Sequence, residues 1–137
     1  MDGKPIKIGV LGGSVTKGQS LKNQELENWT SLYLKAWKEL FPNSETVLIN
    51  GAVGATTSDY YSACFAEHID EDVDLVILEL LINDRRCVKS GGQTLLCFTI
   101  YCNSAESDAI AYEWLTRALL ALPRAPAVVN LHASEFQ

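Results

Sequence analysis

The sequence predicts an α/β fold of three layers, in which helices cover both faces of a parallel sheet. Short apolar runs typical of buried strands alternate with amphipathic helical stretches, giving the order βαβαβαβ along the chain. No two of these strands are separated by the short glycine-containing turn that indicates a hairpin. We therefore expect right-handed crossovers between parallel strands, which place the carboxyl ends of all strands at one edge of the sheet.

Length and composition indicate a single domain that covers residues 1–137. Apolar residues make up 47% of the chain and charged residues 20%, which is ordinary for a soluble domain and excludes a disordered one. The net charge of −6 argues against nucleic acid or an anionic membrane surface as the main partner. No apolar run is long enough to span a membrane, and no signal peptide precedes the first strand. A cytoplasmic protein is expected if Met1 is the genuine N-terminus, although an internal piece of a longer chain would look the same.

The four cysteines do not indicate a metal site. No Cys-x-x-Cys spacing occurs, and neither histidine lies close to a pair of cysteines, so we expect no zinc site. Buried free thiols are the simplest interpretation, and a disulfide within the stretch Cys87–Cys102 stays open if the protein is secreted. The other two cysteines are Cys64 and Cys97. Asn28 opens a glycosylation sequon, but it falls at an expected helix start.

The first strand leads directly into a candidate catalytic serine. Apolar side chains alternate from Ile6 to Leu11, and the strand then runs into Gly12, Gly13 and Ser14. The two glycines let the backbone turn sharply and leave the serine unshielded at the carboxyl end of the strand. Ligands of open α/β sheets bind at this end, so Ser14 is a candidate nucleophile.

Two other interpretations of this turn are a turn without chemistry and a phosphate cradle formed by its amides. The cradle is weakly supported, because Walker A requires Gly-Lys-Ser/Thr and the order here is Thr16-Lys17-Gly18. The glycines also miss the spacing of the dinucleotide fingerprint. The Gly-x-Ser-x-Gly elbow is not matched either, since Thr16 stands at the position of its last glycine.

Six further elements are expected from hydrophobic period and from capping or breaking residues. They are a helix over 29–40, a strand over 46–50, a helix from 57 or 58 to 68, a strand over 75–80, a helix over 107–122 capped by Ser107, and a strand over 127–131. The stretch from Cys87 to Cys102 has no clear period. Glu79 interrupts an otherwise apolar central strand, so its carboxylate must be hydrogen-bonded or paired. The acidic link 70–74 is expected to be a solvated turn.

Three loops at the ends of successive strands resemble the first three sequence blocks of the SGNH hydrolases, the GDSL-type esterase and lipase superfamily. The blocks are Gly12-Gly13-Ser14-Val15-Thr16, residues 50–57 (Asn-Gly-Ala-Val-Gly-Ala-Thr-Thr) and residues 79–84 (Glu-Leu-Leu-Ile-Asn-Asp). The resemblance covers about residues 5 to 132. Two departures occur: Gly13 replaces the aspartate of the Gly-Asp-Ser form, and Glu79 opens the third block in place of Gly-x-Asn-Asp.

The resemblance implies a flavodoxin-like parallel sheet and hydrolysis of an ester, with Ser14 as nucleophile. The backbone N–H groups of Ser14 and Gly54 and the side-chain amide of Asn83 would form the oxyanion hole. Held ready for the developing charge, such donors contribute strongly to the rate. We expect no cofactor, and a small-molecule, carbohydrate or lipid ester as substrate. The oligomeric state is not predicted.

The family places its base in a late Asp-x-x-His block after a fifth strand, and this chain has no such block. His68 is expected at the opposite edge of the sheet. His132 is expected on the correct edge, but no aspartate stands three residues before it. We therefore expect the N-terminal part of an SGNH hydrolase without its last strand and helix, inactive or very weakly active by itself.

A function of a different class is a non-catalytic binding protein that uses the same cleft for an acylated sugar or lipid. The missing base favours it for this chain, whereas Ser14, Gly54 and Asn83 favour an esterase. A flavodoxin-like nucleotide binder is the weakest alternative, because the sequence has no phosphate-binding motif.

Overall fold

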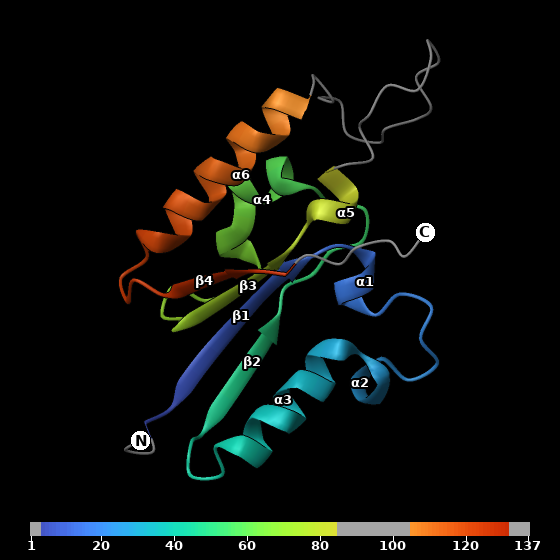
Figure 1. Ribbon diagram of the computed structural model, residues 1–137, viewed down its shortest axis with the longest axis vertical. Helices are drawn as coiled ribbons and strands as arrows, with labels where there is room; N and C mark the ends of the chain where they lie inside the picture. The colour runs from blue at the N-terminus through green and yellow to red at the C-terminus, as the bar shows by residue number, and fades with distance from the viewer. Residues whose placement is uncertain (1–3, 85–104, 132–137) are drawn as a thin grey trace.

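A parallel sheet lies at the centre of the computed structural model, which describes residues 4–84 and 105–131 (Figure 1). In these residues the sheet has four strands in the order β2-β1-β3-β4, all parallel. The strands are β1 (Ile6–Gly12), β2 (Thr46–Asn50), β3 (Leu75–Glu79) and β4 (Ala127–Asn130). The helices are α1 (Ser14–Lys17), α2 (Gln24–Glu27), α3 (Trp29–Leu40), α4 (Ser58–Cys64), the 3₁₀ helix η1 (Phe65–Glu67), α5 (Leu81–Asp84) and α6 (Ala105–Leu120).

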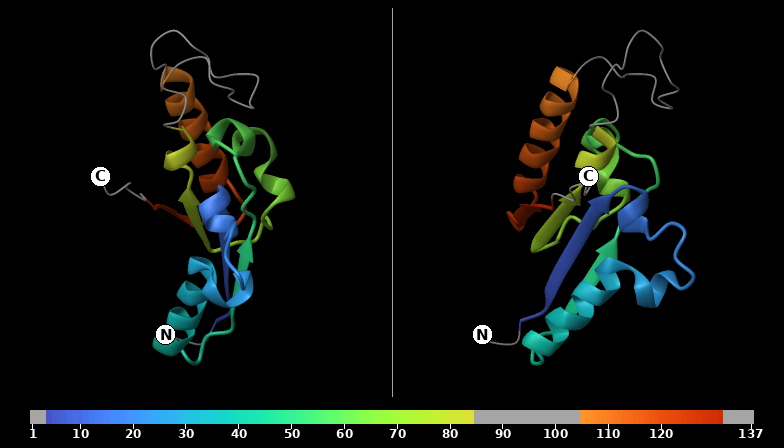
Figure 2. Two further views of the ribbon diagram at one scale, coloured as in Figure 1. Left: turned by 90° about the vertical axis from the view of Figure 1, so that its right-hand side faces the viewer. Right: turned by 45° about the vertical axis from the view of Figure 1, so that its right-hand side comes forward.

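The helices form layers on both sides of the sheet, as the sequence predicts. The two views of Figure 2 show α4 and α6 together on one face and α3 on the other. The core between the sheet and the α4–α6 layer includes Leu11, Leu78, Leu115 and Leu119, none of which is exposed. The predicted three-layer α/β/α sandwich with a parallel sheet is therefore confirmed.

Helix α3 follows the predicted pattern. Trp29, Tyr33 and Trp37 recur every four residues and pack on the sheet against the buried side chains of β1. Asn28 caps the helix, because its side-chain oxygen accepts a hydrogen bond from the Thr30 N–H at 3.2 Å. The Asn28 residue is 3% exposed, so the sequon asparagine is buried in the folded chain.

Several predicted boundaries differ from the structure. Helix α6 begins at Ala105, so Ser107 lies within its first turn and not at the cap. The helix predicted to end at 68 is divided into α4 and η1. Thr57 is the residue before α4, but its side chain makes no capping hydrogen bond.

Some predictions fall outside the described residues. They concern His132 and the whole stretch without a clear period, which includes Cys87, Cys97 and Cys102. Of the cysteines, Cys64 is described, and it is a free, half-buried thiol. Within the described parts of the chain, no helix has the length and apolar character needed to cross a bilayer.

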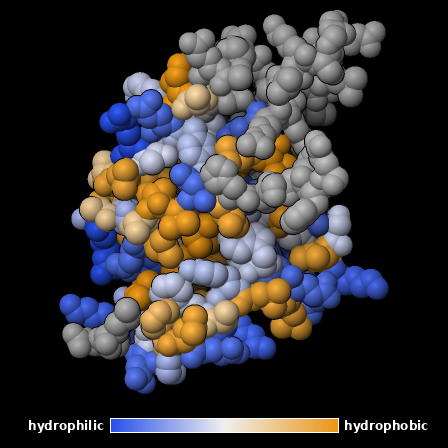
Figure 3. Space-filling view, viewed as in Figure 1, coloured by the Kyte–Doolittle hydropathy of each residue, from blue (hydrophilic) through white to orange (hydrophobic). Residues whose placement is uncertain are grey.

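The acidic link before β3 is an ion-paired surface turn. Asp70 and Asp72 are exposed, and their carboxylates lie 2.9 and 2.6 Å from the Lys7 Nζ. Figure 3 shows apolar side chains gathered over the middle of the molecule in this view. Val129 and Leu131, in and after β4, are among the large apolar residues that remain exposed.

A candidate active site at the carboxyl edge of the sheet

Ser14 lies where β1 ends and begins the single turn of α1. It is half-buried, whereas Gly12 and Gly13 before it are buried. A Cβ on Gly12 would lie 2.4 Å from the Thr16 Oγ, so the close approach of Thr16 requires a glycine there. Gly13 has the extended angles φ −89° and ψ −150°, which any residue can adopt. The sharp turn is therefore made by close packing and not by a left-handed glycine.

The second loop, residues 51–57, is hydrogen-bonded to the end of β1. The Val53 N–H donates to the Gly12 carbonyl at 3.0 Å. Gly54 follows directly and is half-buried, and a Cβ on it would lie 3.0 Å from the Gln19 Oε1. Ala55 then has a φ of 62°, in the left-handed region. The predicted oxyanion glycine thus lies in a tight turn that is joined to the serine loop.

Tyr61 connects the first two loops from inside the core. Its side chain is fully buried, and its hydroxyl faces the carbonyls of Gly12 at 3.0 Å and Gly51 at 3.1 Å. The same hydroxyl accepts the Val53 N–H at 2.9 Å. Tyr61 is not among the residues that the sequence motifs predict for the site. Its sequence position does carry a signal, because a tyrosine on the apolar face of a helix needs a hydrogen-bond partner for its hydroxyl.

Asn83 in α5 reaches both other loops. Its Nδ2 donates to the Thr56 carbonyl at 2.7 Å. The same nitrogen would lie 2.2 Å from a Cβ placed on Gly13, which means that the amide lies against the bare α-carbon beside Ser14. The structure therefore brings the Ser14 turn, the loop of Gly54 and the Asn83 amide together, as the sequence predicts.

Asp84, the next residue, holds the start of α4. Its Oδ1 accepts the Ser58 N–H at 2.9 Å, and both residues are buried. The carboxylate takes over the role that the predicted Thr57 or Ser58 cap would have had. Adjacent residues of α5 therefore fix the end of the second loop, through Asn83 and Thr56, and the start of α4, through Asp84 and Ser58.

Glu79 lies behind the Ser14 turn. It is 3% exposed, and its Oε2 accepts the Thr16 hydroxyl at 2.7 Å. The Gly13 N–H faces this carboxylate and stabilises its charged form. Burial raises the pKa of Glu79 above its ordinary value, and the Thr16 hydroxyl and the Gly13 N–H offset part of that rise. The expectation that this carboxylate is hydrogen-bonded is confirmed.

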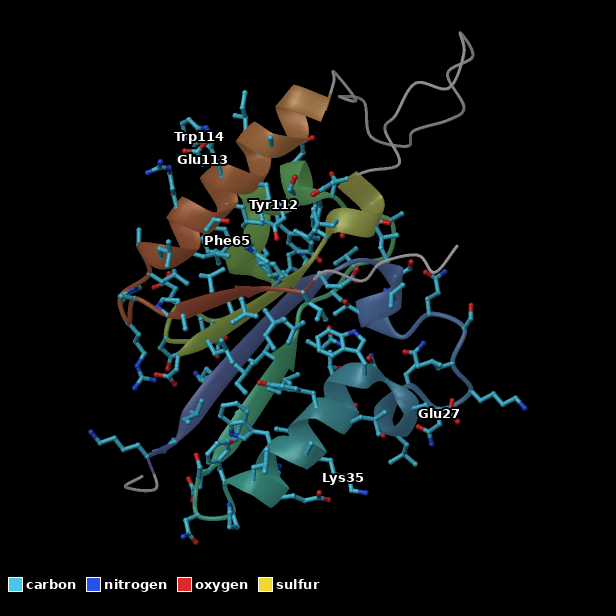
Figure 4. All side chains as sticks on the ribbon, viewed as in Figure 1. Glu27, Lys35, Phe65, Tyr112, Glu113 and Trp114 are labelled. Carbon is cyan, nitrogen blue, oxygen red and sulfur yellow. The ribbon has the colours of Figure 1, made fainter. Side chains whose placement is uncertain are left out.

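Tyr112 of α6 has a phenol group whose pKa is affected by two acidic residues of this edge. Figure 4 shows it on the side of α6 that faces the molecule, and Trp114 on the outer side. Its hydroxyl donates to the Asn130 Oδ1 at 2.7 Å. Burial raises the pKa of Tyr112 to about 12, and the negative charges of Asp84 and Glu79 add to this effect.

The base is not assigned by the described residues. The His68 Nε2 lies 2.9 Å from the Tyr60 hydroxyl, and its ring packs edge-on against Tyr61 with centroids 5.5 Å apart. His132 lies outside the described residues. Across the described ranges 4–84 and 105–131, no cluster of three or more histidine, cysteine or acidic residues is arranged to hold a metal ion.

Solved esterase structures share this fold. No protein-family model and no curated protein matches the chain. A two-domain esterase (CEX) active on acetylated mannans aligns with a TM-score of 0.76 and 28% identity, over 95% of this chain and 30% of that one. AlinE4, an SGNH-hydrolase family esterase, aligns with a TM-score of 0.64 and 16% identity, over 91% of this chain and 57% of that one. The psychrotrophic esterase EstA from Pseudoalteromonas sp. aligns with a TM-score of 0.56 and 18% identity, over 90% and 57%.

The likeness to SGNH hydrolases that the sequence indicates is confirmed at the level of the fold. The chain spans about a third of the mannan esterase and somewhat more than half of the other two proteins.

Proposed function

We propose that this chain carries the nucleophile and the oxyanion hole of an ester hydrolase. Ser14 attacks the acyl carbon, and the oxyanion is held by the backbone N–H groups of Ser14 and Gly54 and by the Asn83 amide. The fold shared with SGNH-hydrolase esterases supports this proposal, and so does the meeting of the three loops at one edge of the sheet.

The position of Asn83 is the observation that carries the proposal. An amide nitrogen has two hydrogens, and the bond to the Thr56 carbonyl uses one of them. That bond also fixes the side chain against Gly13, next to Ser14. The second hydrogen then serves as a donor whose direction is set before the substrate arrives, which is the arrangement that stabilises a developing oxyanion.

The reaction proceeds through a covalent acyl-enzyme. The Ser14 oxygen bonds to the acyl carbon and loses its proton to a base, and the collapse of the oxyanion releases the alcohol, which takes up a proton. Water then attacks the acyl-serine and releases the acid. No redox change occurs at any step.

The substrate class that we propose is an acetylated carbohydrate. It rests on the mannan esterase, the one of these three structures that is described as acting on a named substrate.

Acetate release from acetylated mannan oligosaccharides tests this function, with p-nitrophenyl acetate as a second substrate. Ser14→Ala is the key variant and Ser20→Ala, an exposed serine, is the matched control. Added imidazole can stand in for a base. We expect slow hydrolysis that imidazole accelerates in the wild type and in Ser20→Ala. Ser14→Ala should lose the imidazole-dependent part that exceeds the rate of the same imidazole solution without protein.

Hydrolysis that is equal in Ser14→Ala and wild type would contradict the proposal. Saturable binding of the oligosaccharide without any Ser14-dependent turnover would instead support the non-catalytic binding protein. Turnover that needs no imidazole and is lost in His132→Ala would assign the base to His132.

A further inference from the structure

A carboxylate that has no role in the proposed chemistry is buried directly behind the nucleophile turn. Glu79 ends β3 and is paired in register with Gly12 at the end of β1. The other four residues of β3 are apolar, as expected for a central parallel strand. A carboxylate at such a position is costly to bury, so it calls for a specific explanation.

The two groups that stabilise the charged Glu79 stand on either side of Ser14 in the chain. One is the Thr16 hydroxyl, which donates at 2.7 Å, and the other is the Gly13 N–H, which faces the carboxylate. Thr16 is fully buried, and its side chain fills the space that a Cβ on Gly12 would need. The carboxylate is thus hydrogen-bonded to one end of the short segment that contains the serine and lies beside its other end, where Gly12 pairs with Glu79.

Thr16 is also held from the opposite direction. Its backbone carbonyl accepts hydrogen bonds from the Nδ2 atoms of Asn28 and Asn50, each at 2.9 Å. Asn28 precedes α3 and Asn50 ends β2, whereas Glu79 belongs to β3. The turn is therefore clamped between β3 on one side and the β2–α3 layer on the other.

We propose that Glu79 is a positioning residue for the reaction at Ser14. Through Gly13 and Thr16 it sets the direction of the Ser14 hydroxyl and N–H relative to Asn83, without touching the substrate. This inference rests on the function proposed above. Its physical basis is that small displacements of a reacting group lower the rate strongly even when the fold is intact.

A purely structural role makes a different prediction. If Glu79 served only to hold the fold together, its loss would lower stability and rate in parallel. If Glu79 instead positions Ser14, its loss lowers the rate but not the stability. A buried carboxylate lowers stability, and it is kept because the reaction needs it. Glu79→Gln keeps the size of the side chain and removes its charge, so it distinguishes these roles.

Thr16 supplies a matched pair of variants. Thr16→Val removes the hydroxyl at constant shape, and Thr16→Ser retains it. Thr116→Val, which removes a hydroxyl that donates to the Tyr112 carbonyl within α6, is the control distant from the site. The readouts are the rate of Ser14 phosphonylation by a fluorophosphonate, the free energy of unfolding in urea, and the exchange rate of the Gly13 amide hydrogen.

We expect Thr16→Val and Glu79→Gln to slow phosphonylation by about tenfold to a hundredfold. Thr16→Ser and Thr116→Val should react at close to the wild-type rate, and Glu79→Gln should be at least as stable as wild type at pH 7. Wild-type rates in both Thr16→Val and Glu79→Gln would overturn the proposal. So would an equal loss in Thr16→Ser, or a loss of stability in Glu79→Gln that matches its loss of rate.

The amide exchange separates this proposal from the function on which it rests. If wild-type Ser14 does not react, the proposed function fails, but exchange can still be measured. Faster Gly13 exchange in Thr16→Val than in Thr16→Ser would support the clamp by Glu79. Equal Gly13 exchange in the two variants would overturn the clamp. This holds even if Ser14 does not react, and even if Thr16→Val is less stable than Thr16→Ser.

Discussion

The side-chain amide of Asn83 occupies the space that a side chain at position 13 would fill. A Cβ on Gly13 would lie 2.2 Å from the Asn83 Nδ2, and the backbone angles of Gly13 are those of ordinary extended chain. The glycine is therefore needed for the contact and not for its conformational freedom. The Gly-Asp-Ser form that the sequence resembles has an aspartate at this position, whereas the present chain has no room for a side chain there.

Gly13→Ala tests this contact through the sign of its effect on stability. At an unstrained backbone position the exchange of glycine for alanine stabilises by about 0.4–1 kcal/mol. Here the new methyl group must displace Asn83, so we expect a loss of about 1–3 kcal/mol in urea unfolding. We also expect the Ser14 reaction to fall about 10²-fold. Val15→Ala, at a residue that is 52% exposed, is the control. A stabilised and fully reactive Gly13→Ala would show that Asn83 does not depend on this space.

Substitutions of the neighbouring residues Asn83 and Asp84 should have different effects, one on the reaction rate and the other on stability. Asn83→Ala removes the proposed oxyanion donor, so kcat should fall about 10²–10³-fold with little change in KM. Asp84→Ala removes the carboxylate that accepts the Ser58 N–H, so it should lower stability by about 1–3 kcal/mol. Steady-state kinetics and urea unfolding of both variants measure the split. Equal kcat in Asn83→Ala and wild type would remove Asn83 from the proposed oxyanion hole.

Tyr61→Phe should destabilise the chain without changing its shape. The phenylalanine fills the same buried space, but the carbonyl of Gly51 loses a donor and the Val53 N–H loses an acceptor. We expect a loss of about 1–2 kcal/mol. Tyr60→Phe, at a residue that is 38% exposed, is the matched control and should change stability by less than about 0.5 kcal/mol. An equal loss in the two variants would mean that the Tyr61 hydroxyl does not tie the loops.

Glu79 makes stability depend on pH in a defined direction. Burial raises its pKa above the ordinary value of 4.5. A carboxyl group whose pKa is raised in the folded state adds most to the free energy of unfolding below its unfolded pKa. This stabilisation is lost as the pH rises through the folded-state pKa. Glu79→Gln cannot ionise. Its stability relative to wild type should therefore increase as the pH is raised from below 4.5 to neutral.

Urea unfolding at pH 4, 5.5 and 7 measures this difference. Glu67→Gln, at an exposed glutamate, controls for the loss of one negative charge. A difference between Glu79→Gln and wild type that shrinks or stays constant over this range would contradict the raised pKa of Glu79.

The sequence was sufficient to predict the parallel sheet and the meeting of the three candidate loops at its carboxyl edge. Alternation and helical period locate the strands and α3, and the carboxyl ends of parallel strands must meet at one edge. That rule alone places Ser14, Gly54 and Asn83 near one another. The need of Glu79 for a partner also followed from its position in an apolar strand.

The partners themselves could not be predicted. Thr16 lies 63 residues before Glu79, and Tyr61 lies 49 residues after Gly12, so each contact depends on how the layers pack. The start of α6 was misplaced for a local reason. Ala105 is a good helix former, so the helix begins before Ser107, which the sequence pattern predicts as the cap.

The most direct test of the central claim is the site at which a fluorophosphonate attaches to the chain. Intact-mass and peptide mass spectrometry would follow wild type and Ser14→Ala, each with and without imidazole. We expect one phosphonyl group on Ser14 of the wild type, formed faster with imidazole, and none on Ser14→Ala. Attachment to another residue at the same rate in both proteins, or no attachment to Ser14 under any of these conditions, would contradict it.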